Sequence, residues 1–313
     1  MGYPRSMTVL ADDAGFYHCI SRCVRRAWLC GEDPVTGENF DHRRCWIEQR
    51  LIDLAASFPV GLYAWAVMSN HTHVVLRIDP QRAWAWSDEE AAFRWARLTR
   101  NLEPDADHRV RDRMDRILAD PERLEEVRHR LGSLSWFMRF LNECIARQAN
   151  AEDGCTGRFW EGRFRCQALL DEPAVLACMA YVDLNPVRAG LADDLAGSDF
   201  TTIQRRLREF EVEPDEVPQE LDVIAGENSS AGPSISPRGY IELVQWTGLR
   251  TRPEQRGMHE ATVPRALAEV RGPPDWWVGC VSRIEAVFGT AVGLPVTLKN
   301  HAAITGRCWL RGA

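Results

Sequence analysis

Four segments near the start of the chain follow one another in the order strand, helix, strand, strand. Residues 16–24 ("FYHCISRCV") alternate aromatic and branched side chains with polar ones, which is typical of a strand. Residues 41–58 carry apolar side chains at helical spacing and predict an amphipathic helix. Residues 61–70 and 71–79 predict two more strands, joined at a Ser-Asn turn. This β-α-β-β order predicts a domain of mixed α and β structure.

Two more helices and one strand are predicted before residue 191. Residues 133–154 carry one apolar stripe and predict a helix, and residues 157–170 predict a turn followed by a strand. Residues 171–190 predict a helix that ends near Asn185, because a residue before proline disfavours helical backbone. The charged residues 80–132 predict two or three solvated helices, which we interpret as an insertion.

Composition divides the chain near residue 210. Residues 211–238 are acidic and then rich in Gly, Ser and Pro, which predicts a linker. Residues 239–313 predict a mainly helical C-terminal region, in which no catalytic constellation is visible. We therefore expect one larger domain over residues 1–210, with its insertion, and a small C-terminal region of unknown role.

Charge and hydropathy limit the classes of function. The 313 residues carry a net charge of −7, so a nucleic-acid-binding surface must be argued from motifs and not from charge. No run of about 18 apolar residues and no signal peptide is visible, so we expect a cytoplasmic protein without a membrane partner. The ten cysteines include no CxxC pair and are expected to be free thiols. Those at 19, 23, 30 and 45 are close enough to suggest zinc, but their spacing matches no standard finger.

His71 and His73 stand one residue apart in the second of the paired strands. Side chains of a strand alternate between its faces, so both imidazoles point the same way, with Cα atoms about 7 Å apart. Two imidazoles on one face are either half of a metal site or two unrelated polar side chains. The pair alone does not decide between these interpretations.

Tyr181 is the tyrosine with the most suggestive neighbours. Asn185 follows it by four residues, so one helical turn places the amide on the same face as the phenol. The alternative is that Tyr181 closes the apolar face of its helix and has no chemical role.

Arginines interleaved with aromatic residues are typical of proteins that bind single strands, because arginine pairs with phosphates and aromatic rings stack on bases. The candidates are Arg158, Phe159, Trp160, Arg163 and Arg165 in one block, and Arg22, Arg25 and Arg26 after the first strand. The alternative is a turn and a strand whose aromatic side chains pack in the core.

Three blocks in this order, "AVMSNHTHVVL", "GRFWEGRFRCQALL" and "MAYVDLNPVRAGL", resemble the HUH-type single-strand DNA transposases. Among them they resemble the branch of REP-associated tyrosine transposases. The resemblance covers Phe16 to Leu191 and leaves out the C-terminal region. One departure is Thr72, where the family has a hydrophobic residue between its two histidines.

The resemblance implies an α+β fold, namely a ferredoxin-like domain with a central antiparallel sheet and helices. It implies that Tyr181 is the nucleophile, forming a 5′-phosphotyrosine, and that His71, His73 and Asn185 hold Mg²⁺ or Mn²⁺. It implies a transposase that cleaves and rejoins single-stranded DNA at hairpin-forming, palindromic sites. Whether the chain acts as a monomer or a homodimer is left open.

Two other functions remain open on the sequence. The first is a domesticated, non-catalytic nucleic-acid-binding protein of the same fold. The second is a metal-dependent hydrolase that uses water, with Tyr181 as a core residue.

Overall fold

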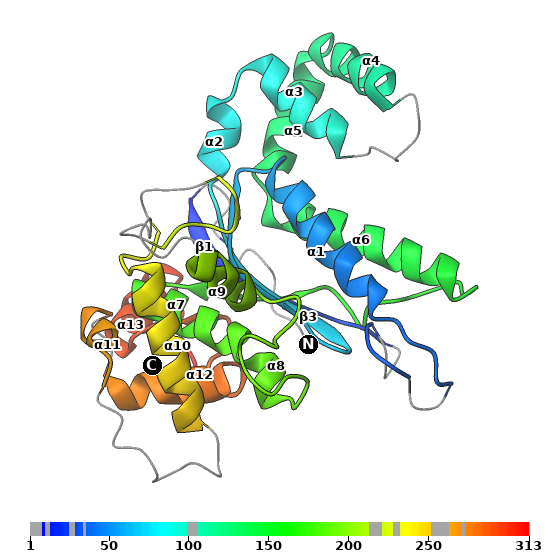
Figure 1. The fold of residues 1–313 in the computed structure, drawn as a ribbon. Helices are drawn as coiled ribbons and strands as arrows, with labels where there is room; N and C mark the ends of the chain where they lie inside the picture. Colours follow the sequence, from blue (N-terminus) through cyan, green and yellow to red (C-terminus); the bar gives the residue numbers. More distant parts are fainter. Residues whose placement is uncertain are drawn as a thin grey trace.

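A six-stranded sheet runs through the centre of the molecule (Figure 1). The computed structural model describes residues 8–9, 13–24, 29–33, 36–98, 106–212, 221–227, 232–251, 263–270 and 273–312. The strand order is β5-β2-β3-β1-β4-β6, and only the pair of β4 and β6 is parallel. The strands are β1 (Gly15–Arg22), β2 (Val60–Val67), β3 (His71–Ile78), β4 (Arg165–Leu169), β5 (Ala225–Gly226) and β6 (Ala291–Val292).

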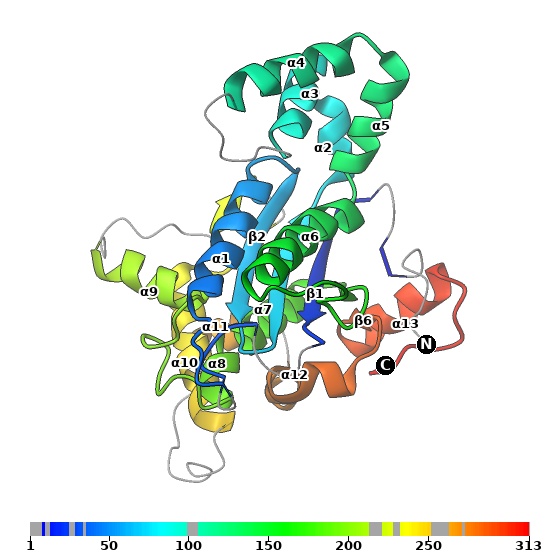
Figure 2. The same ribbon diagram turned by 90° about the vertical axis from the view of Figure 1, so that its right-hand side faces the viewer.

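The central part of the sheet has ferredoxin-like topology. The chain runs β1-α1-β2-β3-α6-β4, and the four strands lie in the order β4-β1-β3-β2 with all neighbours antiparallel. Helices α1 (His42–Ala55) and α6 (Leu134–Glu152) pack against each other on one face of the sheet, while α7 (Glu172–Asp183) packs on the other (Figures 1 and 2). The predicted α+β fold is confirmed.

Local sequence signals account for the elements around the site. The turn between β2 and β3 closes with a 2.9 Å hydrogen bond from the Met68 amide to the His71 carbonyl. Helix α7 begins at Asp171, whose side chain accepts a hydrogen bond from the Ala174 amide at 3.0 Å. A short helix α8 (Asn185–Arg188) follows α7, with Pro186 in its first turn.

In its described residues, 80–98 and 106–132, the charged segment after β3 forms four helices, where the sequence predicted two or three. They form a projection at one end of the sheet (Figures 1 and 2). Side chains of Ser87 and Asp120 cap two of them. The ends of the segment meet, since a Cβ placed on Gly132 would lie 3.2 Å from the Pro80 Cα. The helices are α2 (Pro80–Ala85), α3 (Asp88–Arg97), α4 (Ala106–Leu118) and α5 (Pro121–Leu131).

Two of the remaining helices lie beside α7. Helices α10 and α12 both contact α7, so the C-terminal region packs against the first domain. The predicted linker, residues 211–238, overlaps the end of α9 and includes β5 together with the buried Leu221. The remaining helices are α9 (Thr202–Val212), α10 (Pro237–Thr251), α11 (Arg265–Glu269), α12 (Pro274–Val287) and α13 (Pro295–Ile304).

Asp183, at the end of α7, joins three helices. Its buried carboxylate accepts hydrogen bonds from the Thr202 hydroxyl at 2.6 Å, the Ile203 amide at 3.1 Å and the Tyr240 hydroxyl at 2.6 Å. Burial raises the pKa of this carboxyl to about 6. The network fixes α9 and α10 against the helix that carries Tyr181.

No helix in the described ranges is both long and apolar enough to cross a membrane.

Candidate active site

The register of the sheet places several polar side chains on the face that α7 covers. His71 lies opposite Arg22 of β1. His73 lies opposite Ile20, whose side chain points to the same face as that of Arg22. His18 lies opposite Gln167 of β4. Because side chains alternate along each strand, these residues share one face. The alternate side chains of β1 point to the other face, toward α6, where the Asn142 amide donates to the Ser21 hydroxyl at 2.9 Å.

Four residues predicted from the sequence converge beneath α7. The rings of His71 and His73 lie with their centroids 4.8 Å apart. The Tyr181 ring lies 5.6 Å from that of His73, and the Asn185 Nδ2 lies 2.9 Å from His73 Nε2. The strand and the end of the helix are 112 residues apart in the chain at this contact. The predicted proximity of the histidine pair, the phenol and the amide is thus present in the fold.

A chain of hydrogen bonds fixes the proton on His73. The Gln167 Nε2 donates to the Gly289 carbonyl at 2.9 Å, which turns Oε1 toward His18 Nδ1, 3.1 Å away. His18 must therefore carry its proton on Nδ1, and its bare Nε2 accepts from His73 Nδ1 at 2.9 Å. His73 therefore has its lone pair on Nε2, where it accepts a hydrogen bond from the Asn185 Nδ2 at 2.9 Å.

Burial keeps these imidazoles neutral. It lowers the pKa of His18 to about 4 and that of His73 well below its ordinary value, with the neighbouring His18 as the second cause for His73. Burial, then the charge of Arg22, lowers the pKa of His71 to about 4. His71 Nδ1 lies 2.5 Å from the Asn70 Oδ1, an acceptor, so its lone pair is also on Nε2.

This donor set fits a divalent metal ion. Metal-bound histidines are neutral and direct their second ring nitrogen to a hydrogen-bonding partner, as both His71 and His73 do. The Asn185 side chain would offer a third ligand if its carboxamide group flipped, because Oδ1 would then take the place that Nδ2 has beside His73 Nε2. Across the described ranges, this site included, no three His, Cys, Asp or Glu side chains form a metal-binding group, so a third ligand here would have to be the Asn185 carboxamide. The cysteines are free thiols, and of the four that suggested zinc, Cys45 is exposed while the others are buried.

Tyr181 lies at the edge of the core with its hydroxyl in a polar setting. The side chain is 8% exposed, and its hydroxyl donates to the Glu285 Oε1 at 2.8 Å. The Arg188 guanidinium lies 5.2 Å from the ring centroid. Burial, and then the charge of Glu285, raises the pKa of the phenol above its ordinary value. The phenol is therefore protonated at neutral pH.

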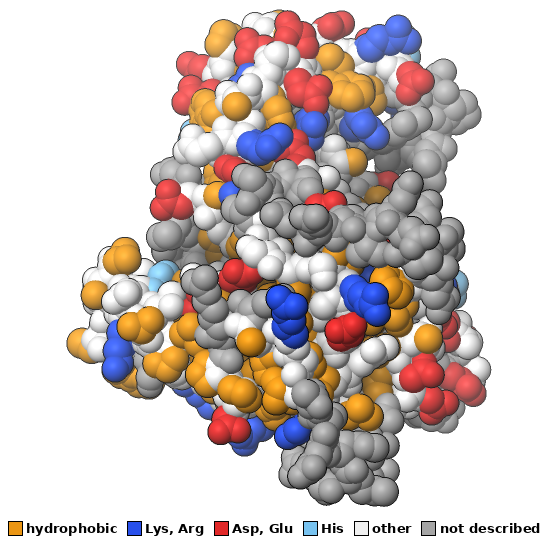
Figure 3. All heavy atoms as spheres, turned by 60° about the vertical axis from the view of Figure 1, so that its left-hand side comes forward, with side chains coloured by type: hydrophobic (Ala, Val, Ile, Leu, Met, Phe, Trp, Pro, Cys, Tyr) orange, Lys and Arg blue, Asp and Glu red, His pale blue; other side chains and the backbone are white. Residues whose placement is uncertain are grey.

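The predicted nucleic-acid contacts divide into three groups. Arg22, Arg158, Arg163 and Arg165 are exposed, whereas Arg25 and Arg26 lie outside the described residues. Phe159 and Trp160 are only 2% and 9% exposed, and the Trp160 indole donates to the Asn142 carbonyl at 2.8 Å. For these two rings the stacking role is corrected to core packing, because a buried ring cannot meet a base. On the face drawn in Figure 3, basic and acidic side chains are interspersed.

Three residues of the site were not found from the sequence. His18 and Gln167 lie in the predicted strands, but only the register shows that His18 meets His73 and that Gln167 meets His18. Glu285 lies in the C-terminal region, where no catalytic constellation was expected, and its carboxylate accepts the hydroxyl hydrogen of the candidate nucleophile. An amphipathic helix with one glutamate offers no local signal for such a contact.

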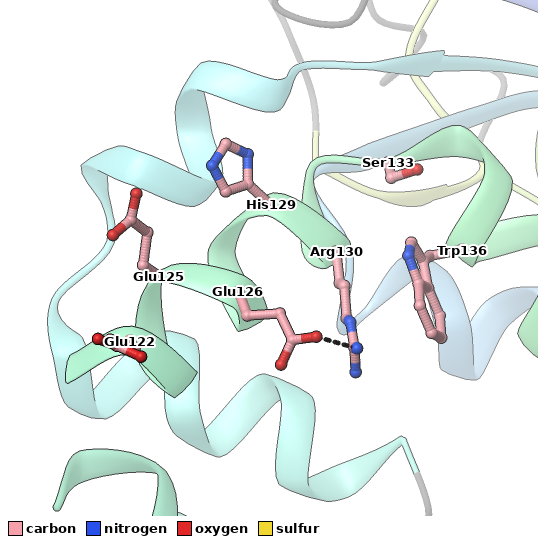
Figure 4. A pocket seen from close by; sticks show the side chains of 7 residues that line it. All are labelled: Glu122, Glu125, Glu126, His129, Arg130, Ser133 and Trp136. Carbon is pink, nitrogen blue, oxygen red and sulfur yellow. Dashed lines mark hydrogen bonds and ion pairs between the residues drawn. The ribbon is translucent and has the colours of Figure 1, made fainter. Parts of the chain in front are cut away.

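A separate cavity of about 390 Å³ lies in the insertion and is unsuited to a phosphate backbone (Figure 4). Three glutamates line it, and Arg130 contacts one of them, Glu126, so its only arginine is already paired with an acid. The lining residues are Glu122, Glu125, Glu126, His129, Arg130, Ser133 and Trp136.

Comparison with known proteins gives one structural match. No protein-family model matches the chain, and no curated protein matches its sequence. Among solved structures, it is similar to the REP-associated tyrosine transposase bound to a REP hairpin, with 14% sequence identity and a TM-score of 0.41. The match covers 74% of this chain and 100% of that one.

Proposed function

We propose that the chain is a DNA transposase that cleaves and rejoins single strands at hairpin-forming sites through a covalent link to Tyr181. The observation that carries this proposal is the convergence of His71, His73, Tyr181 and Asn185 beneath one helix. A histidine pair alone, or a buried tyrosine alone, can be explained by packing in the core. A phenol beside two imidazoles with fixed lone pairs is instead the arrangement expected of a catalytic site.

The phosphate of the scissile bond would lie between the Tyr181 hydroxyl and the lone pairs of His71 and His73. Attack of the phenol oxygen on phosphorus forms an O–P bond and breaks the bond to the 3′-oxygen, leaving a 5′-phosphotyrosine. The bond energy is retained in the ester, so another 3′-hydroxyl can reverse the step and join new ends. One tyrosine allows one cleavage at a time in each site.

His71, His73 and Asn185 would hold Mg²⁺ or Mn²⁺. When bound, such an ion withdraws charge from the phosphate and aligns it for in-line attack. The protein's own contribution is to keep both imidazoles neutral and aimed, through Asn70 for His71 and through His18 and Gln167 for His73. Exposed Arg158 and Arg163, close in sequence to β4, are proposed to contact the strand's phosphates.

The test uses hairpin oligonucleotides labelled at the 5′ or the 3′ end, incubated with the protein and Mg²⁺ or Mn²⁺. We expect a protein–DNA adduct that survives denaturation and carries the fragment downstream of the cut. Tyr181→Phe is expected to abolish the adduct. The matched control is Tyr63→Phe, since the buried Tyr63 hydroxyl has no hydrogen-bond partner among the described residues and its loss should leave the adduct unchanged.

Other outcomes separate the alternatives. Cleavage that persists in Tyr181→Phe identifies water as the nucleophile and overturns the phosphotyrosine step. Hairpin binding without cleavage under either metal supports a non-catalytic binding protein of the same fold.

A further inference from the structure

Helix α12, from the C-terminal region, brings a carboxylate to the candidate nucleophile. One oxygen of Glu285, Oε1, accepts the Tyr181 hydroxyl at 2.8 Å, and the other, Oε2, lies 2.9 Å from an Arg165 nitrogen. The Glu285 side chain is 22% exposed, whereas that of Arg165 is 63% exposed. Glu285 is thus held between the phenol and the arginine that begins β4.

The position of Glu285 is fixed by a contact between α12 and the nucleophile's own helix pair. Arg188, at the end of α8, donates to the Val281 carbonyl at 2.7 Å and also to the Ser282 carbonyl. These carbonyls precede a kink at Arg283, where φ is −148° and ψ is 36°, two residues before Glu285. The same guanidinium lies over the Tyr181 ring. One arginine therefore ties together the kink, the phenol and the carboxylate.

The chemistry of the proposed reaction requires a proton acceptor at this place. A phenol carries its proton at neutral pH, and an oxygen that attacks phosphorus must lose that proton. The nearby imidazoles direct their lone pairs toward the proposed metal position, and Arg188 offers only donors. Glu285 is the group that already accepts the hydroxyl hydrogen, at the distance expected of a general base.

We propose that Glu285 is a catalytic residue that acts as the general base for Tyr181; this rests on the function proposed above. As the phenol oxygen bonds to phosphorus and the 3′-oxygen leaves, the phenol proton moves to Glu285 Oε1, and the 3′-oxygen takes a proton from a solvent water, which becomes hydroxide. In the reverse step a 3′-hydroxyl attacks the phosphotyrosine and gives its proton to solvent hydroxide, while Glu285 returns its proton to the departing phenol oxygen. After both steps Tyr181, Glu285 and the solvent are in their starting protonation states.

The test measures the rate of adduct formation in a single turnover with the labelled hairpin and Mn²⁺. Glu285→Gln keeps the size and the hydrogen bond but cannot take the proton, so we expect the rate to fall about 100-fold or more. Hairpin affinity, Mn²⁺ affinity and the unfolding midpoint should stay at wild-type values. The matched control is Glu242→Gln, which changes an exposed glutamate of α10 paired with Arg238.

A second variant separates proton transfer from a structural role. Fluorinated tyrosine at position 181 has a phenol of lower pKa and depends less on a base, so it should restore most of the rate in the Glu285→Gln background. A rate that is unchanged or increased in Glu285→Gln, or that fluorinated tyrosine does not restore, overturns the role of Glu285 while the adduct itself upholds Tyr181 chemistry. Absence of any adduct from the unaltered protein overturns the proposed function and this role with it.

Discussion

His73 has one proton arrangement because its neighbours leave no other. The Gly289 carbonyl orients the Gln167 amide, the amide oxygen orients His18, and His18 accepts the proton of His73. A lone pair in a fixed direction is what a metal ion requires of an imidazole, and partners of this kind are known to matter nearly as much as the ligands.

Removing His18, the hydrogen-bonding partner of His73, is expected to weaken metal binding. His18→Phe leaves His73 Nδ1 without an acceptor and frees the ring to change tautomer, so we expect the affinity for Mn²⁺ to fall about 10- to 100-fold. Calorimetric titration of the protein with Mn²⁺ measures this, without DNA. His108→Gln, in an exposed side chain of α4, is the control. Unchanged Mn²⁺ affinity in His18→Phe would contradict the role of the hydrogen-bond chain.

The buried histidines also predict the direction of acid sensitivity. Folding lowers the pKa of His18 from 6.5 to about 4, so between these values the unfolded chain binds the proton more strongly. Stability is therefore complete above pH 6.5 and is lost as the pH falls toward 4, by about 3 kcal/mol for this residue alone. Urea denaturation at several pH values measures how the free energy of unfolding changes with pH. His18→Gln should reduce this pH dependence. An equal pH dependence in the variant would show that His18 is not its cause.

Local pattern predicted those site residues whose role is visible in short segments. His71 and His73 share a strand face by alternation, and Tyr181 and Asn185 share a helix face by spacing. Glu285 could not be predicted, because its contact depends on how α12 packs on α7. Phe159 and Trp160 looked like stacking residues only because sequence does not show that their rings turn inward.

At the scale of elements, helix α7 connects the parts of the site. It carries Tyr181 above the sheet, leads directly into Asn185, and anchors α9 and α10 through Asp183. Its beginning and its end were both predictable, from Asp171 as a cap and from Pro186 as a terminator. The neighbours that it would gather were not predictable, since they come from distant segments.

Loss of the Asp183 carboxylate is expected to weaken the attachment of α9 and α10 to α7 and so to destabilise the fold. Asp183→Ala leaves three buried donors without an acceptor, so we expect a loss of about 3 kcal/mol or more in the free energy of unfolding. Asp183→Asn should cost less, because its amide oxygen still accepts and no charge is buried. Chemical denaturation compares the two variants. Equal losses would show that the hydrogen bonds are not the cause.

At the scale of the whole molecule, the insertion contacts the rest of the fold at its two ends and through α3, whose Arg94 donates to the Ala56 carbonyl and whose Trp95 packs on Trp136. Its ends meet where Gly132 approaches Pro80, although its four helices were only partly anticipated from the charged sequence. The ferredoxin-like order around it was the most predictable part of the chain, since every element there carries a clear periodicity. The packing of the C-terminal region on α7 was the least predictable.

Excising the insertion is expected to leave the site intact. Replacement of residues 81–131 by a short Gly-Ser linker can join β3 to α6, because the ends already touch. We expect a folded protein with unchanged Mn²⁺ affinity and a lower unfolding temperature, since Trp136 loses its packing against Trp95. Circular dichroism and Mn²⁺ titration test this. Loss of Mn²⁺ binding in a folded variant would show that the insertion supports the site.

The contact between Tyr181 and Glu285 joins positions 104 residues apart. If Glu285 takes the phenol proton, a nascent chain can bury its sheet and place its tyrosine long before it can cut. Order of synthesis would then delay cleavage by the proposed transposase until α12 has been translated and has docked on α7.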